Sequence, residues 1–584
     1  MSLATVWPES ITGYLVIASL GLLFALLAKG RAHPAKLMVG LALIFYLTGL
    51  VKLEAFLASY VNPAVMTLML LLIVGMVLEK TVWLNWLANK LFSQSLRGSY
   101  AKMGAFVGLS SGFLNNTAIV ASLLSASQNN RFHLPSRVLI PLSYIAILGG
   151  TLTLVGTSTH LLVNGLLVQA GFTPFALLDF IWVGLPILVV GTLVILLLAP
   201  LFLPKYESKQ TKKQDYFVEA VIEVQSPLIG QTIKQAGLRQ LSSLFLVELI
   251  RDGQLISPVS PDTQLEAQDR LLFAGDAHSS QQLAAIPGLS LPKHVGALDT
   301  HNLVEVLISP QSSIVDRSLI EANFRNKFDA AVVAINRGGD KLSGKLGDVV
   351  LQAGDKLLLA TGHDFHQREN LANNFFFMSE RKTQKPLNGW QSIVVMLSFL
   401  VVLALSAFGV VSLFDGLLVL LILFVVTRWL NLKEVRHRMP FDLFFMIGSA
   451  LVIAHVMLTS GAAQIISDGV MNVFGGWGVP GAFIGVYLLT LMMTETVTNN
   501  AAAALAFPVA IATAHGLDVS VLPFVLAVAY GASASFMTPY GYQTNLMVFA
   551  PGQYRFMDYV RMGLPVSLVY SATVLILTPL FFPF

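Results

Sequence analysis

The sequence predicts a helical polytopic membrane protein in which two inverted halves flank a pair of small soluble domains. Three observations lead to this fold class: the composition, the uneven placement of charge and the repeats within the chain. The 584 residues are 55% hydrophobic and only 12% charged, whereas soluble domains carry about 25% charged residues. Most of the chain is therefore expected to lie in lipid.

Charged side chains are concentrated in the middle of the chain. Residues 204–385 hold 41 of the 68 Lys, Arg, Asp and Glu residues, so this segment is predicted to be soluble and its flanks to be compatible with lipid. The chain has no cysteine, which excludes thiolate metal sites and a cysteine nucleophile. The net charge of +4 is explained by the topology described below, and no nucleic-acid partner is expected.

A helix needs about 20 apolar residues to cross a bilayer. By that criterion the sequence predicts spans at 11–28, 37–58, 63–79, 138–170 (interrupted), 178–203, 390–409, 411–428, 440–458, 521–550 (interrupted) and 562–582. Two further apolar segments, 103–127 and 480–514, have a polar break at their centre. They are predicted to be re-entrant hairpins.

The basic residues predict the orientation. Sixteen of them lie outside the soluble segment, and fifteen fall on one side of the membrane if the N-terminus is extracytoplasmic; the exception is Lys52. Because basic residues are enriched in cytoplasmic loops, the insert is predicted to be cytoplasmic, in a bacterial inner membrane. Five spans per half is an odd number, so the two halves must be inverted, as in many secondary transporters.

The two halves share polar motifs at the hairpins and at the interrupted spans. Residues 115–118 (NNTA) match 499–502 (NNAA), and residues 156–160 (GTSTH) match 541–545 (GYQTN). Small residues would allow close helix packing, but packing does not require paired asparagines in both hairpins. Helix N-termini at such breaks hold anions, and freed carbonyls coordinate cations. An anion site between two cation sites is therefore predicted.

The soluble segment contains a repeat of its own. Ser226, Arg251 and Asp269 recur 86 residues later as Ser312, Arg337 and Asp355. Alternating apolar strands predict two small α+β domains. The domain boundaries are predicted at 1–204 for the first membrane half, 205–292 and 293–378 for the two soluble domains, and 379–584 for the second membrane half.

These motifs resemble those of the divalent anion/sodium symporter family, and the resemblance covers both membrane halves. It implies one sodium site at Ser111, Asn115, Asn116 and the Gly156 carbonyl, and another at Glu495, Thr498, Asn500 and the Gly541 carbonyl. It implies an anion site at Asn116, Thr117, Thr157, Asn500, Ala501 and Asn545. The chain departs from the family in lacking Pro-Pro at both breaks, in having His160 in place of Asn, and in having Ala501 in place of Thr.

The insert resembles paired RCK C-terminal (TrkA-C) domains, which bind small regulatory ligands; the ligand is not specified by the sequence. Carriers of the family with such an insert resemble sulfate transporters, so sulfate ranks first as substrate. The resemblance also implies an elevator mechanism and a homodimer, with the lipid bilayer and a small anion as further partners.

Glu495 is the one acidic residue placed deep in a hairpin. An intramembrane carboxylate indicates function by default, either as a sodium ligand or as a proton site, and the alternative is a structural cap of a hairpin helix.

The leading hypothesis is a sodium-coupled importer of a divalent anion. Alternatives are a sodium-coupled dicarboxylate carrier, a cation/proton antiporter, an anion-efflux carrier and a ligand-gated channel. No nucleophile–base pair, phosphate loop or metal-ligand cluster stands out, so no enzyme activity is expected.

Overall fold

The computed structural model divides the chain into two compact units. The membrane unit comprises Met1–Lys205, Lys385–Val548 and Arg555–Phe584, and the second unit comprises Tyr206–Gln384 with Phe549–Tyr554. The structure describes residues 9–584 except 29–33, 82–89, 129, 207–216, 239–240, 242–243, 252–253, 257–258, 261, 276–282, 284, 292–302, 310–311, 338–339, 343–345, 363, 366–367, 369–370, 378–386, 432–434, 437–438 and 440.

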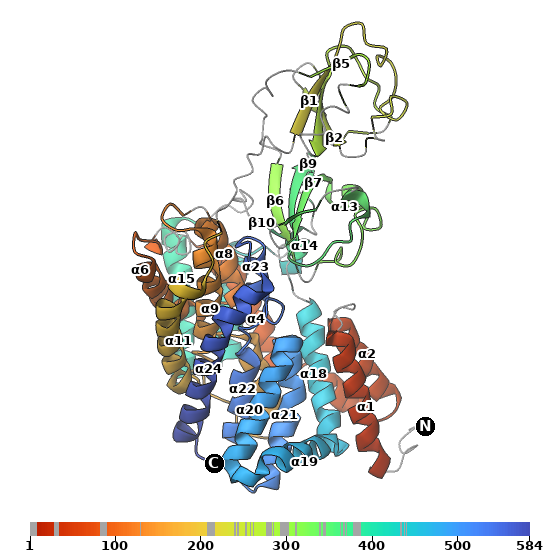
Figure 1. Ribbon diagram of the computed structural model, residues 1–584. Helices are drawn as coiled ribbons and strands as arrows, with labels where there is room; N and C mark the ends of the chain where they lie inside the picture. The colour runs from red at the N-terminus through yellow and green to blue at the C-terminus, as the bar shows by residue number, and fades with distance from the viewer. Residues whose placement is uncertain are drawn as a thin grey trace. The chain divides into compact units, whose positions relative to one another are not determined.

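The described residues of the membrane unit form helices joined by turns and loops, without a strand (Figure 1). Its first half contains α1 (Glu9–Ala28), α2 (Pro34–Leu47), α3 (Leu53–Tyr60), α4 (Pro63–Leu78), α6 (Leu96–Met103), a π-helical turn (Gly104–Gly108), α7 (Leu109–Ser111), α8 (Asn116–Gln128), α9 (Pro135–Gly150), α10 (Ser158–Gln169) and α11 (Ile181–Phe202). Its second half contains α15 (Gly389–Ala407), α16 (Leu413–Val426), α18 (Phe441–Thr459), α19 (Ala462–Phe474), a 3-10 turn (Gly475–Trp477), α20 (Gly478–Thr496), α21 (Asn499–Gly516), α22 (Val521–Ser533), α23 (Gln543–Phe549) and α24 (Phe556–Phe581).

Apolar helices of membrane-spanning length confirm a polytopic membrane protein. Among the described residues, six helical segments are long and apolar enough to cross a bilayer, and five shorter helices are also apolar. The continuous span predicted at 37–58 is wrong: α2 ends at Leu47 and α3 begins at Leu53. The turn between them contains Gly49 in the left-handed region at φ 79°, where a helix cannot continue. Helix α19 was not predicted. The inverted orientation of the halves stays a prediction.

Both interrupted spans are broken near their centres, and in each case a glycine of a later helix packs on the broken backbone. A Cβ at Gly184 of α11 would overlap the backbone of Thr151 and Leu152. A Cβ at Gly563 of α24 would likewise overlap the backbone of Phe536 and Met537. Only glycine allows so close an approach, so the same packing solution occurs in both halves.

The second unit contains two five-stranded antiparallel sheets with the same topology. Their strand orders are β3-β2-β4-β1-β5 and β10-β6-β9-β7-β8. When β1–β5 are matched with β6–β10 in chain order, the second order read backwards is identical to the first. The strands of the first sheet are β1 (Phe217–Ile222), β2 (Leu244–Arg251), β3 (Gln254–Ile256), β4 (Arg270–Gly275) and β5 (Leu289–Ser290). Those of the second are β6 (Leu303–Ile308), β7 (Ala330–Arg337), β8 (Asp340–Lys341), β9 (Lys356–Thr361) and β10 (Phe375–Phe377).

The repeated Arg and Asp residues make the same contact in both sheets. The Arg251 guanidinium donates to both carboxylate oxygens of Asp269, at 2.8 and 2.8 Å, and Arg337 does so to Asp355 at 2.7 and 2.7 Å. Both carboxylates are buried, and a buried charge needs such a paired, hydrogen-bonded partner. These motif residues therefore have a structural role in each sheet.

The two sheets also share a small apolar contact. Leu272 of β4 packs against Val333, Ala334, Leu358 and Ala360 of β7 and β9. The few helices described in this unit are short, with α13 at Phe324–Phe328 and α14 at Leu371–Asn374. Strands therefore dominate the described parts of the insert.

Candidate functional site

Four interruptions of helical structure are joined to one another within the membrane unit. Tip 1 (112–117) comprises the loop between α7 and α8 with the first two residues of α8, and tip 2 (495–500) comprises the loop between α20 and α21 with two helix residues on either side. Break 1 (151–158) comprises the segment between α9 and α10 with the first residue of α10, and break 2 (534–543) comprises the segment between α22 and α23 with the first residue of α23. Non-helical backbone at membrane depth occurs only where protein buries it or where it lines a cavity. These four segments therefore form the candidate site.

Tip 1 and break 1 bring several oxygen atoms to one point. Ser111 Oγ lies 2.5 Å from one amide atom of Asn116 and donates to the Ala146 carbonyl at 2.8 Å. The same amide atom lies 3.3 Å from both the Ala146 and the Gly156 carbonyl oxygens. Such hydroxyl and carbonyl oxygens are suited to a sodium ion. Three of the four residues expected at the first cation site, Ser111, Asn116 and Gly156, thus converge.

The second half repeats this arrangement. Thr494 Oγ1 lies 3.0 Å from Asn499 Oδ1 and 2.6 Å from the Ala532 carbonyl. Helix α21 begins at Asn499, just as α8 begins at Asn116. The structure therefore gives the second half the same hydroxyl–amide–carbonyl group, built on tip 2 and the end of α22.

A second pair of bonds ties each tip to its own break. The Thr153 hydroxyl of break 1 donates to the Gly112 carbonyl. The Thr538 hydroxyl of break 2 donates to the Glu495 carbonyl at 3.3 Å. Each threonine satisfies a carbonyl that the interrupted helix leaves without a partner, which fixes the tip against the break.

The observed pattern shifts the predicted match between the halves by one residue. Asn116 corresponds to Asn499, which was not among the predicted ligands, and Asn500 corresponds to Thr117. Thr494, one residue before the predicted Glu495, has a hydroxyl whose bonds match those of Ser111 in the first half. The cation role of Glu495 stays a prediction. The predicted match paired Asn115 with Asn499 and Asn116 with Asn500 because the letters are identical, and this pairing produced the shift. The cation roles of Thr498 and Gly541 stay predictions.

Hydrogen bonds also join each break to the tip of the other half. Gln543 Oε1 accepts from Thr117 Oγ1 at 3.2 Å, and Ser158 Oγ donates to Asn500 Oδ1 at 3.2 Å. Both Gln543 and Ser158 follow the glycine of their break by two positions, so the two links are equivalent. Tyr542 adds a third link, because its hydroxyl lies 2.8 Å from the Asn116 amide.

The linked side chains are all neutral, and the positive charge at the site comes from helix ends. Helices α8, α10 and α21 begin at Asn116, Ser158 and Asn499 and have 13, 12 and 18 residues. Each directs its first N–H groups, which have no carbonyl partner within the helix, and the positive end of its dipole toward the interruptions. The arrangement is suited to an anion that is bound by neutral donors.

Several predicted residues have their side chains engaged in holding the backbone. Asn545 is buried, accepts from Ser143 at 2.7 Å and donates to the Ser535 and Thr538 carbonyls at 3.0 and 3.3 Å. His160, at the matching position of break 1, lies 3.1 Å from the Thr153 carbonyl through Nδ1. The substitution of His for Asn in the family motif therefore retains a contact to the backbone of the break.

The remaining predicted ligands differ in exposure. The Asn115 side chain is exposed and accepts from the Thr117 backbone N–H at 2.8 Å, which is the contact of a helix start. Ala501 is fully buried. Thr157 lies next to the cross-half link, with its hydroxyl 3.4 Å from that of Tyr542.

Glu495 is bound to the backbone of break 2. Its Oε1 accepts from the Phe536 and Met537 N–H groups at 2.9 and 2.9 Å. These donors follow the end of α22, so the carboxylate caps the interruption. Its Oε2 is buried and has no hydrogen-bond partner within the described residues. The contacts favour the capping role, and the sodium and proton roles stay predictions.

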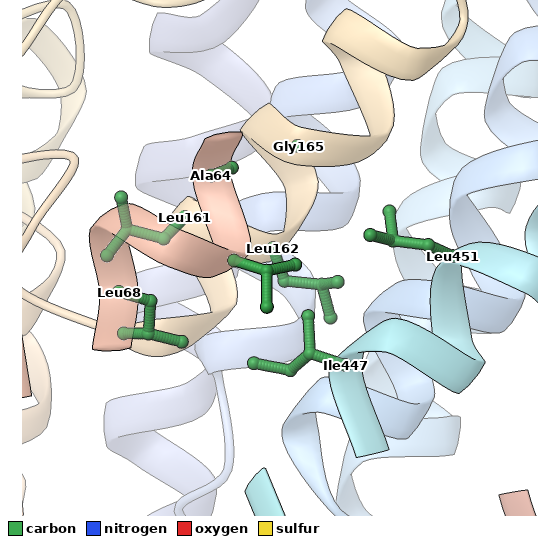
Figure 2. Close-up of a pocket in the computed structure, with 8 residues that line it drawn as sticks. Ala64, Leu68, Leu161, Leu162, Gly165, Ile447 and Leu451 are labelled. Atoms are coloured by element: carbon green, nitrogen blue, oxygen red, sulfur yellow. The ribbon is translucent and has the colours of Figure 1, made fainter. Parts of the chain in front are cut away.

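An apolar pocket lies among α4, α10 and α18 (Figure 2). It is lined by Ala64, Val65, Leu68, Leu161, Leu162, Gly165, Ile447 and Leu451. Figure 2 shows Leu162 of α10 and Ile447 of α18 directed toward the same space. Without polar lining groups, this pocket cannot compensate an anion for lost hydration.

Sequence reasoning missed Thr494, Asn499, Ser158, Tyr542 and Gln543. One signal was available for the first two, because Ser111 and Asn116 are five residues apart and so are Thr494 and Asn499. No local signal identified the others. The partners of Tyr542 and Gln543 lie 426 residues away in the chain, and only the folded structure brings them together.

Comparison with known proteins gives matches along most of the chain. A family model described as citrate transporter (CitMHS) matches residues 22–529. A putative sulfur deprivation response regulator of Chlamydomonas reinhardtii is 31% identical over 570 residues, covering 92% of this chain and 96% of that protein. An uncharacterized transporter of Synechocystis is 30% identical over 566 residues, covering 91% and 90%. Sodium/sulfate cotransporter 2 of C. reinhardtii is 27% identical over 371 residues, covering 61% and 42%.

The repeated hydroxyl–amide–carbonyl group predicts a difference between two neighbouring threonines. Thr494→Val should lower the melting temperature, because the Ala532 carbonyl loses its hydroxyl donor, at a cost of about 1–3 kcal/mol. Thr498→Val should leave it nearly unchanged, because Thr498 Oγ1 has no hydrogen-bond partner in the described structure. Thermal unfolding of the purified variants in detergent measures both. Equal melting temperatures would show that the match between the halves is incorrect.

Proposed function

The chain belongs to the citrate transporter family, and from this membership we propose that it is a sodium-coupled carrier that imports a small divalent anion, most specifically sulfate, across a bacterial inner membrane. It is a membrane transporter and not an enzyme, as the family and its relatives indicate. Relatives named sodium/sulfate cotransporters support both the coupling ion and the anion class.

The direct hydrogen bonds between the halves are the observation that carries the choice of sulfate. Gln543–Thr117 and Ser158–Asn500 are each 3.2 Å apart, and Tyr542–Asn116 is 2.8 Å apart. Side chains in direct contact leave little room between the breaks and the tips. A compact tetrahedral anion requires less separation of these groups than citrate or another dicarboxylate does. Sulfate carries no proton near neutral pH, so donor groups alone recognise it.

A dicarboxylate carrier is the second candidate, because the family description names citrate. A cation/proton antiporter or an anion-efflux carrier would instead use Glu495 as a proton site. The bonds from the Phe536 and Met537 N–H groups to that carboxylate tie it to the backbone of break 2, which supports a structural role. The antiporter therefore ranks lower.

Uptake measurements test this assignment. Proteoliposomes with an inward sodium gradient should accumulate labelled sulfate, and unlabelled sulfate should compete better than succinate or citrate. Asn116→Ala and Asn500→Ala should each reduce uptake to background, because each removes an amide from a tip. The control is Asn472→Ala, at an exposed position of α19. Wild-type uptake by either tip variant would contradict the site, and preferred competition by citrate would favour the second candidate.

An elevator mechanism fits the apolar seam between α10 and its neighbours. The helix carries Ser158 at its start and packs through Leu161, Leu162 and Gly165 against α4 and α18. Among the described residues, one hydrogen bond crosses this seam, from Asn62 Nδ2 at the start of α4 to the Gly165 carbonyl at 3.3 Å. The remaining seam contacts are between apolar side chains, so few directional bonds break when one element slides along another. We therefore assign α10 to the moving part, and α4 and α18 to the stationary part.

A disulfide across this seam should stop transport. The chain has no native cysteine, and a Cβ at Gly165 would lie 2.9 Å from the Ala64 Cβ. This is closer than the separation of about 3.5–4.5 Å found in disulfides, so a small displacement of α4 from α10 brings the two cysteines to bonding distance. The double variant Ala64→Cys, Gly165→Cys should lose uptake on oxidation and regain it on reduction, while purified protein still binds sulfate. Each single variant is the control. Unchanged uptake by protein shown to be cross-linked would exclude movement at this seam.

Regulation by the insert has a candidate route through one loop. Phe549–Tyr554 belongs to the second unit, although the chain on either side belongs to the membrane unit. Within that loop, Ala550 is buried against Leu307 of β6, with Phe376 of β10 packed beside them. The loop begins where α23 ends, and α23 carries Gln543. Movement of β6 or β10 on ligand binding would therefore be transmitted to the site.

Breaking this contact should mimic removal of the insert. Ala550→Asp places a charge against two apolar side chains, which is unfavourable, so its uptake rate should equal that of a chain in which a flexible linker replaces 210–378. Combining both changes should have no further effect. The control is Gln553→Asn, because this position has φ 56°, which Asn tolerates. A wild-type rate in Ala550→Asp alongside an altered rate in the deletion would exclude the loop as the route.

A further inference from the structure

The two edges of the Asn116 amide face different surroundings. One terminal atom lies against the Ser111 hydroxyl and the Ala146 and Gly156 carbonyls, at 2.5, 3.3 and 3.3 Å. The other lies 2.8 Å from the Tyr542 hydroxyl. Oxygen and nitrogen have nearly the same shape in an amide, so the side chain fits this space in two orientations that differ by a half-turn.

Without a cation, the surroundings favour nitrogen on the oxygen-rich edge. The Ser111 hydroxyl has one proton, and the Ala146 carbonyl lies 2.8 Å from it. The remaining oxygens therefore need a donor, which the Asn116 NH₂ supplies. Asn116 Oδ1 then faces Tyr542 and accepts the phenol proton. In this orientation that proton is engaged and cannot be donated to a ligand.

With a cation among those oxygens, the opposite orientation is favoured. The ion attracts Oδ1 and repels the NH₂ group, so the amide turns by a half-turn and its nitrogen faces Tyr542. The nitrogen now donates to the phenol oxygen at the same 2.8 Å position. Tyr542 therefore keeps one hydrogen bond to Asn116, but its own proton is released. The nearest other acceptor, Thr157 Oγ1, is 3.4 Å away, which is long for a hydroxyl bond.

We propose that Tyr542 is a positioning residue that couples the two ligands: a cation bound at Ser111, Ala146 and Gly156 turns the Asn116 amide, and the turned amide frees the Tyr542 hydroxyl to donate to the anion. The inference rests on the proposed function and deepens it, because it states how sodium strengthens anion binding without contact between the two ions. The release of one donor links the sites, and such coupling is reciprocal: the anion strengthens sodium binding by the same factor.

We call this coupling of the cation and anion sites through Asn116 and Tyr542 the hydroxyl relay. Its reciprocity gives a specific measurement. Tyr542 makes one bond to Asn116 in either orientation, so Tyr542→Phe should leave sodium affinity without sulfate unchanged within about two-fold. With saturating sulfate, the variant lacks the freed donor, and its sodium affinity should be about ten-fold weaker than that of the wild type, the equivalent of about 1.4 kcal/mol. The matched control is Tyr540→Phe, two residues away and 68% exposed.

The experiment is a sodium titration of purified full-length protein, followed by thermal stabilisation, with and without sulfate. If sulfate strengthened sodium binding equally in the wild type and in Tyr542→Phe, the relay would be overturned and the carrier assignment would stay intact. Weaker sulfate binding by the variant to the same extent with and without sodium would also overturn it, since Tyr542 would then be an ordinary ligand. No effect of sulfate on sodium affinity in the wild type would overturn the proposed function, and the relay with it.

A second variant covers the case in which Tyr542→Phe does not fold. Asn116→Asp has two carboxylate oxygens and no N–H, so either edge accepts from Tyr542 and the phenol proton is never released. Sodium should still bind, and sulfate should no longer strengthen its binding. Strengthening that persists in this variant would contradict the relay.

Discussion

The membrane unit depends on one constraint: peptide groups that leave the helix inside an apolar environment must still be hydrogen-bonded. An unpaired amide or carbonyl costs several kcal/mol in such surroundings, and breaks 1 and 2 release many of them. Side chains supply the partners. Thr153 and Thr538 bond the carbonyls of the tips, and Glu495 bonds two N–H groups of break 2. The polar site exists because these breaks are stabilised in this way.

Buried tyrosines extend the same principle across the unit. Tyr144 of α9 donates to the Phe536 carbonyl of break 2 at 2.5 Å, and Tyr559 of α24 donates to the Asn545 carbonyl at 2.7 Å. Tyr530 of α22 donates to the Phe180 carbonyl at 2.9 Å. Two of these three bonds link the halves, and break 2 is thereby stabilised in part by the first half. Closely interlocked halves are consistent with a single site.

Much of the architecture could be predicted because its causes are local in sequence. Apolar length indicated the helices, charge density separated the insert, and the asparagine pairs marked the tips. The residue-level match between the halves could not be predicted, since it depends on where α8 and α21 begin. Letter identity pairs Asn116 with Asn500, whereas the hydrogen bonds pair it with Asn499. The links made by Tyr542 and Gln543 were also inaccessible, because they join distant parts of the chain.

The departures from internal symmetry indicate where the two proposed cation sites differ. Position 112 is glycine in the first half, and its counterpart in the second half is Glu495, whose carboxylate binds backbone N–H groups. Position 157 is a short threonine, and its counterpart Tyr542 is long enough to reach the Asn116 amide. A threonine cannot make the equivalent contact with Asn499, so the hydroxyl relay is possible on one side only. Of the two proposed cation sites, the first is therefore the one whose occupancy a phenol could sense, whereas the second has an acid near its tip. Single side chains thus distinguish two proposed sites that share a repeated motif.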